Sequence, residues 1–128
     1  MIADLDTEQL LATAFCLGSQ HDFQLFKVSR TVIACQTRVV ADAGYQGLTS
    51  LHANSQTPIK KTKLHSLNSE QKAKNRALSK VRILIENIIR KLKIFRILSE
   101  RYRNRRKRFC LRFNLIAAIY NLELQSAC

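Results

Sequence analysis

The chain has 128 residues, of which 46% are apolar and 24% are charged. This balance is typical of one small globular domain and excludes an extended disordered chain. One proline and three glycines make collagen-like, linker-like and turn-rich all-β chains poor candidates. No apolar run reaches the roughly 18–20 residues that a membrane span requires, and the acidic N-terminus is unlike a signal peptide. The sequence therefore predicts a cytoplasmic protein without a membrane partner.

The charge is strongly asymmetric along the chain. The formal net charge is +13, from 22 Lys and Arg against 9 Asp and Glu. Residues 1–58 carry a net charge of −2, whereas residues 59–128 carry +15. Such a concentration of positive charge indicates a polyanionic partner for the second half, most often a nucleic acid. A basic surface that is merely solvated is the alternative interpretation.

The first half of the chain predicts short strands and one helix. Residues 2–5 and 10–17 flank a polar stretch and predict a β-hairpin. A helix then begins near Asp22, which is a suitable cap, with Phe23, Phe26 and Ile33 at helical spacing. Residues 37–41 predict a further short strand, which ends at Asp42.

Asp42 is the first candidate site residue. It lies where the apolar strand runs into a loop that contains Gly44 and Gly47. Ligands and metals gather at the carboxyl ends of strands in α/β sheets, and glycines allow a close approach of the backbone. A carboxylate that only caps the turn is the alternative at this position.

The second half predicts two helices after a connector. Residues 48–68 are rich in Ser, Thr and Asn and contain Pro58, so they form a connector in which residues 58–60 are a further candidate strand. A long helix begins at Ser69 and carries an apolar stripe that extends to Phe95. After the basic stretch 101–108, a last helix buries one face. The expected stripe residues of the two helices are Leu78, Val81, Ile85, Ile88, Leu92, Phe113, Ile116, Ala117, Tyr120 and Leu124.

Glu86 is the second candidate site residue. Arg82 and Arg90 lie four residues before and after it, and Lys93 lies seven residues after it, so the four share one helix face. Two ordinary surface ion pairs are the alternative interpretation. An isolated carboxylate among cations that bind phosphates is also what metal-dependent phosphoryl transfer requires.

The four cysteines form no CxxC pair and no ligand spacing with the three histidines. They predict free and mostly buried thiols rather than disulfides or a zinc site.

Four separated motifs resemble one known family. They are VVADAGYQG at 39–47, NRALSKVRILIENIIRKLKIF at 75–95, RYRNRRKRF at 101–109 and LRFNLIAAIYNLEL at 111–124. In this order they resemble the DDE transposases of bacterial insertion sequences, and more narrowly the IS-five family, which has Harbinger-type counterparts in eukaryotes. The stretch GSQHDFQLFK at 18–27 also matches, with its His-Asp pair as a structural feature.

The resemblance implies an α/β chain with a ribonuclease-H-like fold and three metal-binding acids. Asp42 matches the second acid, and Glu86 matches the helical third acid, with Arg82 and Lys93 as the basic members of the R-x-x-x-E-x-x-x-x-x-x-K signature. Ser79 replaces a tyrosine that the family often has there, which weakens one DNA contact. The implied cofactor is Mg²⁺ or Mn²⁺ in a two-metal site. The candidate DNA-binding residues are Arg82, Arg90, Lys93, Arg103, Arg105, Arg106, Lys107 and Arg108.

The family's first acid has no counterpart in the match. Asp4 and Asp6 are nearby acids, but they flank the predicted hairpin turn and do not lie on a central strand. The chain therefore resembles the C-terminal part of a transposase that lacks the first strand, either a remnant or the second half of a split gene, and is expected to be inactive alone. Residues 1–124 form this truncated catalytic domain, with 1–48, 49–68 and 69–124 as its hairpin-to-strand part, connector and basic helices.

The implied partners are transposon ends and target DNA in the bacterial nucleoid, and also the first-strand segment or a second copy of the chain. Two other functions compete with this one. They are a nucleic-acid-binding protein without enzymatic activity, which uses only the basic helices, and a basic structural protein of a ribonucleoprotein. Asp42 and Glu86 favour the transposase, because a pure binding protein has no need of acids at those positions.

Overall fold

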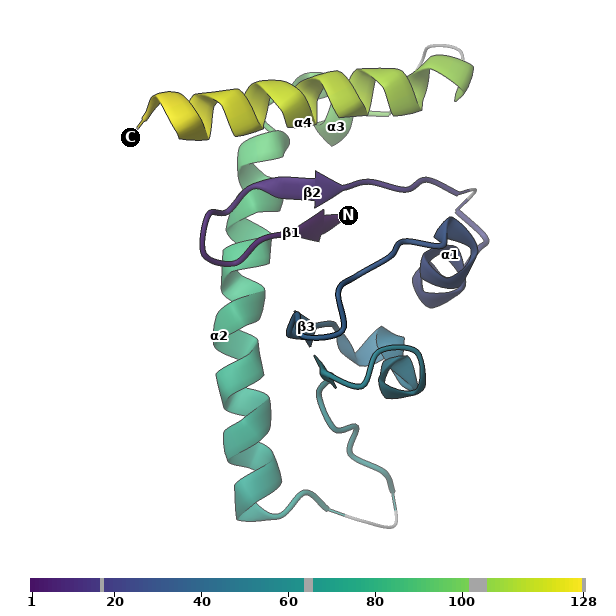
Figure 1. Ribbon diagram of the computed structural model, residues 1–128, viewed down its shortest axis with the longest axis vertical. Helices are drawn as coiled ribbons and strands as arrows, with labels where there is room; N and C mark the ends of the chain where they lie inside the picture. Colours follow the sequence, from purple (N-terminus) through teal and green to yellow (C-terminus); the bar gives the residue numbers. More distant parts are fainter. Residues whose placement is uncertain (17, 64–65, 102–105, 128) are drawn as a thin grey trace. The chain divides into compact units, whose positions relative to one another are not determined.

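The structure is a computed structural model that describes residues 1–16, 18–63, 66–101 and 106–127. The chain divides into two compact units, the first formed by residues 1–15 and 83–128 and the second by residues 16–82. Over the described residues the architecture is mixed α/β, with two small sheets and several helices (Figure 1). The strands are β1 (Ile2–Ala3), β2 (Leu10–Ala12), β3 (Val39–Val40) and β4 (Ser55–Gln56); the α-helices are α1 (Asp22–Ser29), α2 (Ser69–Leu92), α3 (Arg96–Ser99) and α4 (Phe109–Ser126); the 3-10 turns are η1 (Ala43–Tyr45), η2 (Leu48–Ser50) and η3 (Arg106–Arg108).

The first unit contains the predicted hairpin, which is confirmed in a shorter form. β1 and β2 are antiparallel, with Ile2 opposite Ala12 and Ala3 opposite Leu10. In the turn between them, Asp4 accepts hydrogen bonds from the Asp6 N–H at 3.0 Å and the Thr7 hydroxyl at 2.9 Å. These donors, the Asp6 N–H first, lower the pKa of Asp4 because they favour its charged form.

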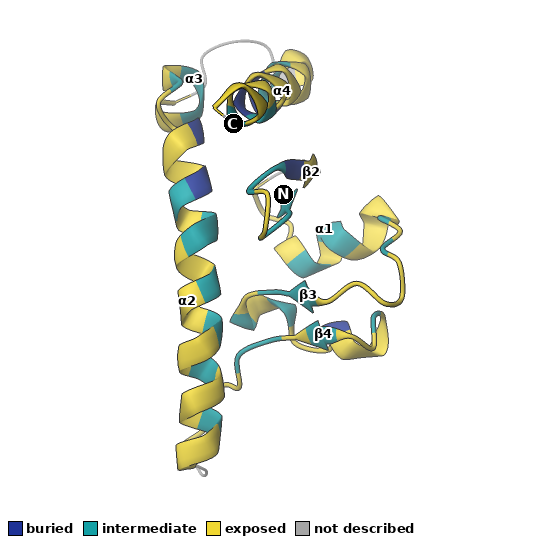
Figure 2. Ribbon diagram, turned by 60° about the vertical axis from the view of Figure 1, so that its left-hand side comes forward, coloured by how far each residue is buried: buried dark blue, intermediate teal, exposed yellow. Residues whose placement is uncertain are grey.

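The core of the first unit joins β2, α4 and the C-terminal turns of α2, where the buried residues lie (Figure 2). The predicted stripes are confirmed at the residues that form this core. The buried members are Leu10, Ile88, Leu92, Ile116, Ala117 and Tyr120. The stripe does not continue to Phe95 on one helix, because α2 ends at Leu92 and Phe95 caps α3. This turn allows Ile97 and Leu98 of α3 to pack against the same cluster.

The second unit holds the predicted strand, the loop with Asp42 and helix α1. β3 pairs in parallel with β4, with Val39 opposite Ser55 and Val40 opposite Gln56. The candidate strand at 58–60 is wrong, because β4 lies before Pro58, a residue that lacks the N–H needed for strand pairing. Leu48, in η2, is 2% exposed and is the buried apolar residue of this unit among the described residues.

Helix α1 is shorter than its apolar pattern predicts. It ends at Ser29, and Arg30 takes a left-handed conformation with φ of 48°, so Ile33 lies outside the helix. The cap also differs from the prediction. His21 Nδ1 accepts the Phe23 N–H at 3.3 Å, while Asp22 is the first helical residue, where its charge suits the N-terminal dipole.

The prediction of mostly buried thiols is wrong for the described cysteines. Cys16, Cys35 and Cys110 are all exposed and free. None of the three belongs to the buried cluster of the first unit. Cys128 lies outside the described residues. In the described part of the chain, no helix is long and apolar enough to cross a membrane.

Candidate active site

Asp42 lies two residues after the end of β3 and begins the loop that contains Gly44 and Gly47. Its Oδ1 accepts the Ala43 N–H at 2.6 Å and so caps η1. The turn-capping contact of the alternative interpretation is therefore present. The side chain is still 56% exposed, which leaves the carboxylate accessible to solvent and ligands.

The same oxygen of Asp42 pairs with Arg82 of α2. Arg82 Nη1 lies 3.7 Å from Asp42 Oδ1, and the Arg82 side chain is 63% exposed. An exposed pair of this kind stabilises a protein by a few tenths of a kcal/mol to about 1 kcal/mol. Its importance is geometric, because it brings the strand-end carboxylate beside the helix that carries Glu86. This contact between Arg82 and Asp42 was not predicted from the sequence, which grouped Arg82 with Glu86.

The loop after Asp42 packs on α1 through aromatic rings. The Tyr45 ring lies 5.7 Å from that of Phe23 and 6.3 Å from that of Phe26, between centroids. Burial, and then the carboxylates of Asp22 and Asp42, raise the pKa of Tyr45 because all three disfavour its anion. The loop with Asp42 therefore rests on a small aromatic support.

Glu86 lies on α2 within the first unit, one helical turn after Arg82. Its side chain is exposed. Arg90 donates to Asn87 Oδ1 at 3.0 Å, and Lys93 follows the end of the helix with an exposed side chain. Helix periodicity places Arg82 and Glu86 on one side of α2, as the sequence predicts.

The C-terminal basic stretch is described only in part. Arg103 and Arg105 lie outside the described residues, as does the side chain of Arg106. Lys107 and Arg108 are exposed in η3, which leads into α4. Both are thus open to solvent, as a phosphate contact requires.

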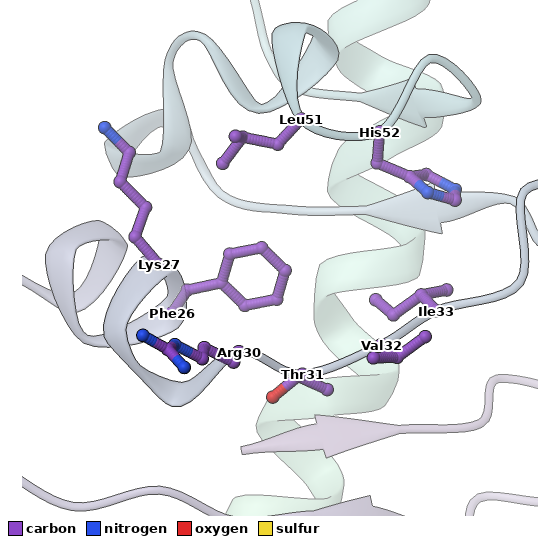
Figure 3. A pocket seen from close by; sticks show the side chains of 8 residues that line it. All are labelled: Phe26, Lys27, Arg30, Thr31, Val32, Ile33, Leu51 and His52. Atoms are coloured by element: carbon purple, nitrogen blue, oxygen red, sulfur yellow. The ribbon is translucent and has the colours of Figure 1, made fainter.

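The second unit also contains a pocket of about 430 Å³ (Figure 3). Its lining contains none of the predicted site residues. Phe26, Ile33 and Leu51 give it an apolar part, and Lys27 and Arg30 add positive charge to its wall. The pocket and the loop of Asp42 therefore have no residue in common.

Comparison with known proteins identifies the family. Residues 1–122 match the family described as "Transposase DDE domain". The chain belongs to this family. It is also 52% identical over 118 residues to the "Probable transposase for insertion sequence element IS702" of Microchaete diplosiphon, a match that covers 92% of this chain and 43% of the relative. The chain thus spans less than half the length of that relative. No solved structure matches it significantly.

The donor chemistry of this transposase chain suits a hard divalent cation in part. Asp42 and Glu86 carry carboxylates, and carboxylate oxygens are the ligands that Mg²⁺ and Mn²⁺ prefer. Among residues 1–16, 18–63, 66–101 and 106–127, no three His, Cys, Asp or Glu side chains form a metal-binding group. Asp4 accepts hydrogen bonds within the hairpin turn of the first unit, where the sequence places it.

The sequence did not predict the contacts of two polar residues, Gln46 and Asn75, that hold the backbone near the loop of Asp42. Gln46 donates to the Ala43 and Pro58 carbonyls at 3.2 and 3.0 Å. Asn75 of α2 bonds the backbone of Ile59 through both ends of its amide, at 2.9 and 3.0 Å. The sequence does contain a signal for the role of Asn75. Asn75 lies seven residues before Arg82, a spacing that puts both residues on one face of a helix.

Proposed function

We propose that this chain supplies the second and third metal-binding acids of the catalytic site of an insertion-sequence transposase of the IS-five type. Asp42 and Glu86 would hold Mg²⁺ or Mn²⁺, which would supply Lewis-acid chemistry for phosphoryl transfer on DNA. The observation that carries the proposal is the Asp42–Arg82 ion pair at 3.7 Å, because Arg82 precedes Glu86 by one turn of α2.

The fold that this function requires is a ribonuclease-H-like sheet. In that fold the first acid lies on a central strand. The proposal assigns this first acid to none of the acidic residues in the sequence.

The substrate of the proposed function is DNA. The net charge of +15 on residues 59–128 provides sequence-independent attraction to phosphates. Arg82 and Lys93 then contact the reacting strand beside the acids, whereas Arg90 and the stretch that contains Arg103, Arg105, Arg106, Lys107 and Arg108 hold the flanking duplex. These contacts position DNA and read little sequence.

Paramagnetic relaxation by Mn²⁺ tests the paired acids directly. In the 14.7 kDa chain, substoichiometric Mn²⁺ should broaden the amide signals around Asp42 and around Glu86 together, since a bound Mn²⁺ ion relaxes every nearby nucleus. Asp42→Asn should abolish the broadening at both positions. Glu70→Gln is the control, because Glu70 pairs with Lys74 at 3.2 Å in the first turns of α2. Independent broadening at Asp42 and Glu86 would contradict the proposal.

A nucleic-acid-binding protein without catalysis remains the competing function. It predicts that Asp42→Asn and Glu86→Gln leave DNA binding and its metal dependence unchanged. The transposase predicts that Mg²⁺ strengthens DNA binding by the wild type more than by either variant.

A further inference from the structure

A short basic segment in the second unit has a defined position that the site described so far does not explain. It comprises residues 58–63 (PIKKTK), which we term the lysine segment, and leads from β4 toward α2 (Figure 2). Lys60, Lys61 and Lys63 are all exposed. The sequence has no acidic residue between Asp42 and Glu70, so these lysines have no acid nearby in the chain to neutralise them.

The backbone just before the lysines is held by side chains from both sides. Gln46 Nε2 donates to the Pro58 carbonyl at 3.0 Å, and the same nitrogen donates to the Ala43 carbonyl at 3.2 Å. Asn75 Oδ1 accepts the Ile59 N–H at 2.9 Å, while its Nδ2 donates to the Ile59 carbonyl at 3.0 Å. Two consecutive residues of the segment are thereby fixed, and one tether leads directly to the residue after Asp42.

Helix α2 supplies a common anchor for the lysine segment and for Asp42. Asn75 and Arg82 are seven residues apart and so lie on one face of α2. Asn75 holds Ile59, and Arg82 lies 3.7 Å from Asp42. The lysine segment and the loop of Asp42 are consequently fastened to the same side of one helix, within a single unit of the structure.

Solubility does not require the backbone before the lysines to be held in place. Fixing a loop residue costs backbone conformational entropy, and exposed lysines are solvated equally well on a mobile loop. Holding lysines in fixed positions is useful when their charges must align with regularly spaced charges of a partner. Phosphate groups of nucleic acid are such partners, because they recur at fixed intervals along a strand.

We propose that Lys60 and Lys61 bind backbone phosphates of the DNA strand that lies at Asp42, and that Asn75 and Gln46 are their positioning residues. The inference rests on the proposed function, since it names a contact to the same DNA substrate. It adds a phosphate-binding site in the connector, a region to which sequence analysis assigned no role.

The salt dependence of DNA binding tests the two lysines. Fluorescence anisotropy with a short labelled duplex, measured at several salt concentrations, gives the slope of log Kobs against log salt. In the full chain, the double variant Lys60→Ala, Lys61→Ala should make this slope shallower by about two, because each neutralised phosphate contributes roughly 0.9 to the slope. The control Lys27→Ala, Lys74→Ala removes the same charge but should change the slope by less than one. Lys27 lies over the Phe23 ring at 4.4 Å, and Lys74 pairs with Glu70.

A second variant tests positioning. Asn75→Ala releases Ile59 without removing any charge, so a purely structural role leaves the salt slope unchanged. The proposal requires a slope shallower by about one, with unchanged helix content. Ser79→Ala is the matched control on the same helix, because its hydroxyl bonds only back to the Asn75 carbonyl at 2.9 Å among the described contacts.

The outcomes separate this inference from the function on which it rests. Absence of any salt-dependent DNA binding by the wild-type chain overturns both. Normal DNA binding with an unchanged slope in the double lysine variant overturns the inference alone, as does an equal loss in the two double variants. Tighter binding of an RNA duplex with the same slope change overturns the assignment to DNA.

Discussion

Single polar side chains form hydrogen bonds between residues that lie far apart in the sequence. Asn121 of α4 is the clearest example, because its amide accepts the Leu10 N–H at 2.8 Å and donates to the Leu10 carbonyl at 2.9 Å. Leu10 is 7% exposed and belongs to the core of the first unit. The amide thus satisfies both backbone groups of a buried strand residue, where an unmet group costs about 1–3 kcal/mol.

Asn121→Ala should therefore lower the free energy of unfolding by about 1–3 kcal/mol. Asn114→Ala is the matched control on the same helix, because Asn114 accepts only the exposed Thr13 hydroxyl, at 2.6 Å, among the described contacts. Its cost should stay near 0.5 kcal/mol, at the low end for a net hydrogen bond. Urea unfolding followed by circular dichroism measures both. Equal losses would contradict the role given to Asn121.

At the scale of elements, the turn between β1 and β2 is held by both long helices. Lys91 of α2 lies 2.9 Å from the Glu8 carboxylate, and Tyr120 of α4 donates to the Glu8 carbonyl at 3.3 Å. Glu8 itself has a left-handed φ of 58°. The hydrogen bond to Glu8 raises the pKa of Lys91, and burial raises the pKa of Tyr120. Both contacts therefore need the protonated forms.

This turn predicts a loss of stability in alkaline solution. A pKa raised by folding means that the unfolded chain releases its proton first, so stability falls as pH rises past the ordinary values of 10.0 for Tyr120 and 10.5 for Lys91. The free energy of unfolding should fall above about pH 10, and less steeply in Tyr120→Phe than in the wild type. Denaturant titrations at pH 8 to 11.5 measure this. A parallel fall in both proteins would assign the effect to other groups.

The same elements show what the sequence can and cannot predict. Hydrophobic periodicity located α2 and α4 and the core residues Ile88 and Tyr120, because burial of one face leaves a regular pattern. It overextended α1 toward Ile33, since the left-handed Arg30 interrupts the helix without any glycine to indicate it. β4 and the tethers of Asn75 were missed, because contacts between distant polar residues leave no local pattern.

At the scale of the whole molecule, membership of the DDE transposase domain family agrees with the concentration of positive charge in residues 59–128. The strand ending at Asp42 and the basic helix carrying Glu86 agree with the structure, and the chain belongs to the DDE transposase domain family. The joint role of these two acids as metal ligands is the proposal made above.

A polypeptide that consists of residues 1–128 alone should be catalytically inactive. With Mg²⁺ or Mn²⁺ it should neither nick DNA nor join strands above background, because two carboxylates leave most positions around a hard cation to water. They cannot orient a metal pair toward both the attacking and the leaving oxygen. The exposed edge of β1 should also favour association, since an unpaired strand edge invites pairing with another chain.

Adding a strand that bears the family's first acid, as a fusion or a second polypeptide, should restore cleavage of a labelled duplex in a gel assay. Asp42→Ala or Glu86→Ala should then abolish it, whereas Asp4→Ala should have no effect on the chemistry, because Asp4 serves the hairpin turn. Restored activity that survives Asp42→Ala would remove that acid from the site. Metal-dependent cleavage by residues 1–128 alone, lost in Asp4→Ala or Asp6→Ala, would instead make the hairpin turn the source of the third ligand and the chain a complete nuclease.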